Sequence, residues 1–312
     1  GGPVHNEADN LAEVTSRLAQ TSNRCAATIA VVVVDDGSTD ASLACAVSEV
    51  VRLPGSRVVE LSRNFGKEAA LLAGMDTAMS MDFDALVLMD ADLQHPPEAI
   101  PEMLSKWRAG SDVVIAARKS RASDSLTRRL LSRAFYRIIN RLGDVSIVDG
   151  DGDFRLLTRD AVQALCSLRE QDRFTKGLYS WIGFRQERIF VDFDSRSSGE
   201  SRFNMTELMG LAGSAITSFS SKPLRISLYV GTITGIIAAL LGIEIVIQTL
   251  IFGKQQAGYA SIFCGMMFLG GIQLVTIGLL GEYVGKTYIQ SKDRPPYITR
   301  SVVRVDDQEG TL

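Results

Sequence analysis

The chain has 312 residues, of which 46% are hydrophobic and 22% charged, and its formal net charge is −3. This length allows one sizeable α/β domain with an appended segment, and it excludes three domains. His5 and His95 are the only histidines, so neither a histidine-rich metal site nor a Ser-His-Asp triad is expected. The four cysteines lack metal-type spacing, which favours free thiols in a reducing compartment.

Residues 1–200 alternate between strand patterns and helix patterns. The chain opens without the pattern of a signal peptide, and a first strand before Pro3 is expected to be cut short. Further strands are predicted from apolar and β-branched runs at Thr28–Val34, Arg57–Leu61, Ala85–Met89 and Asp112–Ala117. Helices are predicted between them at Lys67–Met81 and Pro97–Ala109. This order predicts a doubly wound, Rossmann-like α/β domain with ligands beyond the carboxyl ends of its strands.

Within this domain, residues 121–142 predict an amphipathic helix with one apolar and one basic face. The basic face carries Arg128, Arg129, Arg133, Arg137 and Arg141, and Asp124 is the one acid of the segment. A helix of this kind can lie in the headgroup layer of a membrane and attract anionic lipid. The alternative is an ordinary helix that packs on the core and leaves its charged face in water.

The composition changes after Arg225. Between Ser227 and Phe252 the only charged residue is Glu244, and from Gly258 to Leu280 there is none. Each run exceeds the roughly 20 residues that cross a hydrocarbon core, so a hairpin of two transmembrane helices is predicted at 227–252 and 258–284. Residues 201–226 are then a juxtamembrane interface segment, and residues 286–312 a tail. Lysines and arginines flank the outer ends of the hairpin, which predicts that the large domain and the tail are both cytoplasmic.

Carboxylates follow three of the predicted strands. These are Glu7, the pair Asp35 and Asp36, and the pair Asp90 and Asp92. Alternation along the strand points Asp90 and Asp92 to the same side, where their oxygens can hold a hard divalent cation beside a diphosphate. A metal there would neutralise the charge that develops on a departing nucleotide diphosphate.

These segments resemble family-2 glycosyltransferases with the GT-A fold. More narrowly, they are similar to the polyisoprenyl-phosphate glycosyltransferases, which include dolichol-phosphate-mannose synthases and the bacterial GtrB-type enzymes. The resemblance covers nearly the whole chain. It rests on Pro3–Glu7, Asp35–Asp40, Asn64–Glu68, Asp90–Glu98, Gly152–Arg155, Trp181–Phe184, Arg196–Arg202, the paired C-terminal spans and Gly281–Tyr283.

The resemblance implies roles at the donor side of the site. Nucleotide-sugar binding falls to Pro3, His5, Glu7, Asp36, Lys67, Asp90 and Gln94. His5 departs from the tyrosine that is commoner at its position, which weakens the case for base stacking there. Asp92 and Asp90 are the implied ligands of Mg²⁺ or Mn²⁺. For Lys67, the alternative to a place near the diphosphate is a surface lysine on an amphipathic helix.

On the acceptor side, Asp153 is the implied catalytic residue, together with Arg155. The acceptor phosphate is already largely ionised, so Asp153 is expected to orient it more than to act as a strong base. The alternative is that residues 149–153 form a solvated turn, and Asp151 is the rival carboxylate. Because arginine grips phosphate with two donors, Arg118, Arg196 and Arg202 are the expected lipid-phosphate ligands, with Ser201 beside them.

The implied reaction is an inverting transfer of a hexose from a nucleotide-sugar, UDP-glucose as the first choice, to undecaprenyl phosphate. It is expected at the cytoplasmic face of the inner membrane, in a homo-oligomer with no nucleic-acid partner. GDP-mannose, UDP-N-acetylhexosamine and UDP-galactose stay open as donors. A processive polysaccharide synthase is a weaker alternative, because it needs more spans. A non-catalytic, membrane-tethered nucleotide-sugar scaffold is opposed by the full set of acidic residues.

Overall fold

The computed structural model describes residues 2–25, 27–50, 53–119, 151–193, 222–253 and 258–304. The basic helix predicted at 121–142 and most of the interface segment 201–226 lie outside these residues. The first part of the chain forms β1 (Gly2–Val4), α1 (Ala8–Cys25), β2 (Val32–Asp35), α2 (Ser42–Val50), β3 (Arg57–Leu61), α3 (Lys67–Met79) and β4 (Ala85–Leu88). It continues through η1 (Pro97–Ala99), α4 (Ile100–Arg108), β5 (Val113–Arg118), β6 (Asp151–Thr158), α6 (Arg159–Ser167), α7 (Thr175–Trp181) and β7 (Gln186–Val191).

The strands form two adjoining four-stranded sheets, with the orders β1-β2-β3-β8 and β4-β6-β5-β7. The pairs β1–β2, β2–β3 and β5–β7 are parallel, which confirms the doubly wound α/β character expected from the sequence. The sheets meet where Gly2 passes Met89, and a Cβ atom on Gly2 would lie 2.2 Å from the Met89 carbonyl oxygen. Only glycine allows this close approach of two strands.

The strand β6 is the main departure from the predicted pattern. It lies antiparallel between β4 and β5, and the sequence analysis did not predict a strand here. In its register Leu88 faces Arg155, and two more residues along the ladder bring Asp153 opposite Asp90. Residues 151–153 are therefore strand and not the solvated turn that was the alternative.

The strand predicted at Thr28–Val34 is also shorter than expected, because only Val32–Asp35 form β2. The reason lies in its neighbours. The register of β1 pairs with Val33–Asp35, and that of β3 begins opposite Val32. Residues 28–31 thus extend beyond both partner strands, and β propensity alone does not make a ladder.

Helices cover both faces of the second sheet. One core cluster joins α3, α6 and α7 through Leu72, Leu165 and Tyr179, together with Val113 and Ile115 of β5. A second cluster, on the opposite face, joins α1 and α4 to the alternate residues Val114 and Ala116 of β5. This period-two alternation is what a strand buried on both faces requires. We call the two sides the α3–α6–α7 face and the α1–α4 face.

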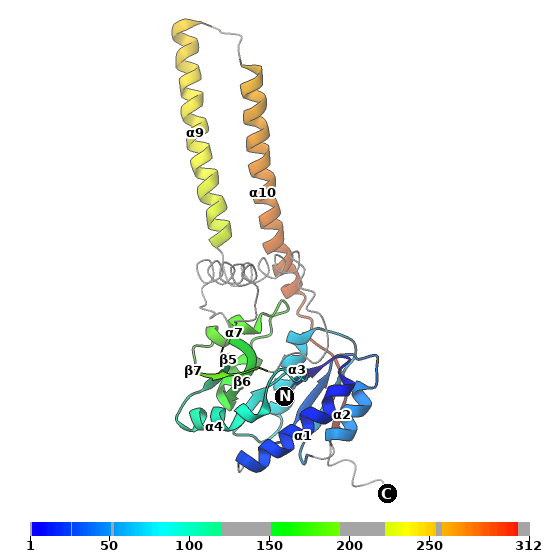
Figure 1. The fold of residues 1–312 in the computed structure, drawn as a ribbon. Helices are drawn as coiled ribbons and strands as arrows, with labels where there is room; N and C mark the ends of the chain where they lie inside the picture. The colour runs from blue at the N-terminus through cyan, green and yellow to red at the C-terminus, as the bar shows by residue number, and fades with distance from the viewer. Residues whose placement is uncertain are drawn as a thin grey trace.

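The C-terminal part contains the two long helices α9 (Lys222–Phe252) and α10 (Tyr259–Ser291), which stand side by side away from the domain in Figure 1. Leu224–Glu244 and Gly265–Ser291 are long and apolar enough to cross a membrane, with mean hydropathies of 2.1 and 1.5. Neither segment is buried inside the protein. Both are candidate membrane spans, as the sequence predicts, and both helices extend beyond the predicted limits.

The tail predicted at 286–312 does not stand apart from the domain. Residues of β8 (Thr299–Arg304) pair antiparallel with β3, with Val303 opposite Val58. Before this strand, Tyr297 packs against the core and its hydroxyl donates to Asp76 of α3 at 2.6 Å. The domain boundary therefore differs from the predicted one, because the chain leaves the first sheet at β3 and returns to it after the hairpin.

Candidate active site

A pocket of about 290 Å³ opens at the carboxyl ends of β1, β2 and β4. Its lining includes most of the residues predicted for the donor and the metal: Pro3, His5, Glu7, Asp36, Lys67, Asp90 and Asp92. Parallel strands bring their carboxyl ends to one edge, and this edge is where doubly wound sheets bind ligands. The spatial grouping predicted from the sequence motifs is therefore present in the fold.

Asp36 organises the donor side of the pocket. It is only 3% exposed, and its two carboxylate oxygens accept from the amides of Phe65 at 2.7 Å and Gly66 at 2.9 Å. These amides belong to the loop that starts α3, so Asp36 fixes the position of Lys67. His5 Nδ1 lies 3.1 Å from the Asp36 carbonyl oxygen, which places the imidazole over the same loop.

The pair Asp90 and Asp92 lies in a tight turn after β4. Leu93 has a φ of 63°, a conformation that is strained for a leucine and that tends to occur at functional sites. The Gln94 side-chain Nε2 donates to Asp92 Oδ2 at 2.9 Å, and the Gln94 backbone N–H donates to Asp92 Oδ1 at 3.1 Å. Gln94 therefore orients Asp92, and it is not among the residues that line the pocket.

His95 supports the same turn, a role that the sequence analysis did not assign. The Asp90 amide donates to His95 Nδ1 at 2.9 Å, which requires the lone pair on that nitrogen. The imidazole stacks on Phe154 at 5.1 Å between centroids. Burial lowers the pKa of His95 against the opposing effect of Asp90, so the ring is held neutral in its accepting form.

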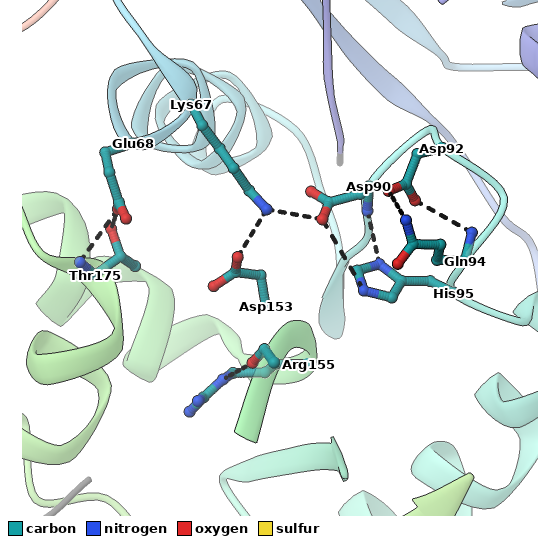
Figure 2. Close-up of polar contacts among 10 residues, drawn as sticks. Lys67, Glu68, Asp90, Asp92, Gln94, His95, Asp153, Arg155 and Thr175 are labelled. Carbon is teal, nitrogen blue, oxygen red and sulfur yellow. Dashed lines mark hydrogen bonds and ion pairs between the residues drawn. The ribbon is translucent and has the colours of Figure 1, made fainter. Parts of the chain in front are cut away.

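Lys67 joins the donor side to the predicted acceptor residue (Figure 2). Its ammonium lies 2.7 Å from Asp90 Oδ2 and 2.7 Å from Asp153 Oδ2. Burial alone would lower the pKa of Lys67, but Asp153 and then Asp90 raise it above its ordinary value. The Lys67 side chain is 44% exposed, but it lines the pocket and is paired with two carboxylates, which favours the place at the site over the alternative of an unrelated surface lysine.

Asp153 is placed by β6 and is 13% exposed. Burial opposes ionisation of its carboxyl group, but Lys67 and then Lys176 lower the pKa of Asp153 below its ordinary value. Among the described residues, nothing donates a hydrogen bond to its buried Oδ1 atom. Buried carboxylate oxygens normally have partners, and this atom lacks a partner that a bound water or ion could supply.

Arg155 lies beneath Asp153 and does not enter the pocket. Its guanidinium is 2% exposed, donates to the Gly152 carbonyl oxygen at 2.9 Å and stacks 4.1 Å from the centre of the Tyr179 ring. These contacts brace the start of β6. The rival carboxylate Asp151 is engaged elsewhere, because it is paired with Arg188 at 2.9 Å. Asp153 does not line the pocket itself, but it is paired with Lys67, which does, and this favours Asp153 over Asp151 as the residue linked to the site.

Glu68 is a further residue that sequence reasoning missed. It follows Lys67 in α3 and accepts hydrogen bonds from the amide and the hydroxyl of Thr175, the first residue of α7. Burial raises the pKa of Glu68 above its ordinary value. The contact fixes α7 against α3, and the acidic residue next to Lys67 was the only signal in the sequence.

The predicted lipid-phosphate residues are only partly covered by the structure. Arg118 ends β5 and is exposed, with its guanidinium 5.3 Å from the centre of the Phe193 ring. Arg196, Ser201 and Arg202 lie outside the described residues. Their assignment stays a prediction.

The acidic pocket also bears on the predicted metal. Asp90 and Asp92 offer carboxylate oxygens, the ligands that Mg²⁺ and Mn²⁺ prefer. Within the described ranges, no group of three or more His, Cys, Asp or Glu side chains is arranged to hold a metal. The fit to Mg²⁺ rests on the two carboxylates alone, since this ion commonly takes one or two carboxylates and completes its shell with water and substrate phosphates.

The fold and the acidic pocket at its strand ends are those of the GT-A class of glycosyltransferases. Residues 3–166 match the family described as glycosyl transferase family 2. The chain belongs to this family, as its motifs led us to expect.

Relatives of nearly the same length agree. A prophage bactoprenol glucosyl transferase homolog of Escherichia coli strain K12 is 38% identical, over 96% of this chain and 97% of that protein. The bactoprenol glucosyl transferase of Shigella phage SfV is 39% identical, over 96% of both chains. Among solved structures, glucosyl-3-phosphoglycerate synthase from Mycobacterium tuberculosis with phosphoglyceric acid gives a TM-score of 0.44 at 17% identity, over 69% of this chain and 77% of that one.

Proposed function

We propose that this glycosyltransferase moves glucose from UDP-glucose to undecaprenyl phosphate, with inversion, at the cytoplasmic face of the inner membrane. Full-length relatives named bactoprenol glucosyl transferases support both the sugar and the prenol acceptor. The candidate spans in α9 and α10 support a lipid acceptor, since a prenyl chain stays in the bilayer.

The observation that carries this proposal is the bridge from Asp90 through the Lys67 ammonium to Asp153. Asp90 lines the pocket with the residues of the donor side, whereas Asp153 comes from β6 and has a buried oxygen with no hydrogen-bond donor in the described part of the chain. In this proposal Asp90 serves the donor and Asp153 serves the acceptor, and a single side chain, that of Lys67, contacts both. Such fixed placement of reacting groups is a large part of enzymatic rate enhancement.

The chemistry needs little proton transfer. An oxygen of the lipid phosphate attacks the anomeric carbon of glucose, and a new carbon–oxygen bond forms. The bond from that carbon to the UDP oxygen breaks, and its electron pair leaves with UDP. Attack from the face opposite to UDP inverts the anomeric centre. Asp153 orients the acceptor, and the Lys67 ammonium lies where it can contact the negative charge that gathers on the diphosphate.

Asp92 and Asp90 would hold Mg²⁺ or Mn²⁺ with the donor. A bound cation would supply charge neutralisation on the departing diphosphate. The hydrogen bonds from Gln94 keep both oxygens of Asp92 in place for this role. Arg118, with Arg196, Ser201 and Arg202, completes the proposal as the group that binds the lipid phosphate.

A donor screen with the full chain in vesicles tests this function. Radiolabelled UDP-glucose, UDP-galactose, UDP-N-acetylhexosamine and GDP-mannose are offered with and without undecaprenyl phosphate. We expect lipid-linked sugar from UDP-glucose only, with no product in EDTA and none without the lipid. Transfer from another nucleotide-sugar would change the donor assignment. Nucleotide-sugar binding without any transfer would instead support the non-catalytic scaffold.

A further inference from the structure

Trp181 is the last residue of α7, and its side chain is 59% exposed. Within the described parts of residues 2–193, Trp181 and Phe190 are the only large hydrophobic side chains that are exposed. A single exposed apolar residue needs no explanation by itself. Its place on the molecule decides whether it has a partner.

The helix α7 belongs to the α3–α6–α7 face, and this face is turned toward the hairpin. Figure 1 shows α7 on the side of the domain nearest α9 and α10, and α4 on the side farthest from them. The chain after α10 returns to the same face, because Tyr297 packs into the core cluster of α3, α6 and α7. The α1–α4 face has no such tie to the hairpin among the described residues.

Contacts near the C-terminal end of α10 hold the segment just before α7 close to the hairpin. Lys286 of α10 is paired with Asp172 at 2.6 Å, and Gln290 accepts from the Gln171 amide at 3.0 Å. Asp172 lies three residues before the start of α7. A helix of seven residues is only about 10 Å long, at 1.5 Å per residue. The headgroup regions add roughly 5–8 Å on each side of the hydrocarbon core. If the hydrocarbon core ends near residue 284, the predicted end of the second span, then Asp172 and the start of α7 lie at the level of the headgroups.

We propose that Trp181 inserts into the headgroup layer of the membrane that α9 and α10 cross, and so fixes the tilt of the catalytic domain over the bilayer. The inference rests on the proposed membrane insertion of the hairpin. The occupant is lipid because tryptophan combines a large apolar ring with one N–H donor, and this combination favours the membrane–water interface. The domain is then held at two points, one at the end of α10 and one at Trp181.

The chain offers a matched pair for the test, since Trp107 and Trp181 are its only tryptophans. Trp107 lies in α4, on the α1–α4 face, where it is partly buried in the core. The variant Trp107→Phe leaves Trp181 as the single fluorophore, and Trp181→Phe leaves Trp107. The full chain is reconstituted in vesicles with a quencher either at the lipid headgroup or deep in the acyl chain. Iodide serves as the quencher from water, and flotation of the vesicles verifies insertion.

We expect the Trp107→Phe protein to lose most of its emission to the headgroup quencher, little to the deep quencher and little to iodide. The Trp181→Phe protein should respond to neither lipid quencher. Subtraction of Trp181→Phe spectra from those of the unmodified chain gives the same answer if Trp107→Phe folds poorly. Quenching of Trp181 by iodide and not by lipid would overturn the inference, and quenching by none of the three would mean that another segment covers the ring. Protein that fails to float with the vesicles would refute the proposed membrane insertion itself.

Discussion

Two carboxylates from distant parts of the chain meet on the Lys67 ammonium, and they are not equivalent. Asp90 belongs to the donor pocket, whereas Asp153 is proposed to serve the acceptor. Replacing Asp153 by Asn keeps the shape and removes the charge. Turnover should fall by on the order of 10²–10⁴, as for the loss of a positioned catalytic group. Calorimetric affinity for UDP with Mg²⁺ should change by less than about 1 kcal/mol.

The bridge through Lys67 makes the affinity measurement the decisive one for Asp153. If UDP binding collapses together with the rate, Asp153 belongs to the donor or metal site. Asp151→Asn is the neighbouring control. It removes the charge of a buried carboxylate that is paired with the partly exposed Arg188, so it should lower stability modestly while turnover per folded molecule is kept.

Lys67 also controls the ionisation of Asp153. Lys67 lowers the pKa of Asp153 against the effect of burial, so Lys67→Met should raise that pKa. A carboxylate with a lowered pKa stays ionised as the pH falls, and this advantage disappears without the ammonium. The acid limb of the rate profile should therefore move to higher pH in Lys67→Met. Lys106→Met is the control. Lys106 lies in α4, and among the described ion pairs its only partner is Glu187 of β7. A lower rate with an unmoved acid limb would restrict Lys67 to the donor.

At the scale of elements, β8 ties the hairpin back to the first sheet. Tyr297 anchors this return through its ring and through its hydrogen bond to Asp76. Tyr297→Ala should cost up to about 3 kcal/mol, the low end for truncation of an aromatic side chain, because the ring is only partly buried. Hydrogen exchange at Val58 and Val59 of β3 should become faster as β8 detaches.

Val302→Ala is the matched control for the β8 prediction. Val302 lies in the same strand but is 43% exposed, so its truncation should leave the exchange of β3 nearly unchanged. Equal exchange in Tyr297→Ala and the unmodified chain would show that β8 holds the sheet without this anchor.

The whole molecule has a predicted orientation in the membrane. Two spans return the chain to the side where it started, and Lys222, Arg225 and Lys286 lie at the outer ends of the hairpin. By the positive-inside rule, the catalytic domain and the tail are then predicted to be cytoplasmic. A cysteine in place of Gln255 should react only with reagents added on the non-cytoplasmic side, and a reporter after Leu312 should read cytoplasmic. The reverse labelling pattern would separate the active site from cytoplasmic nucleotide-sugars.

The expected homo-oligomer also stays a prediction, which light scattering of the solubilised protein can check.

The sequence by itself determined the features that depend on local pattern. The strand ending at Leu88 leads directly to Asp90 and Asp92, and two long apolar runs predict the hairpin, because period and composition carry this information within a few residues. Only the tertiary structure decided which distant residues meet. The antiparallel register of β6 sets Asp153 opposite Asp90, pairs Asp151 with Arg188 and leaves Lys67 between the two sides of the site. Strand order and register follow from packing of the whole sheet, and a strand of six residues such as β8 carries no local mark of the partner that it joins.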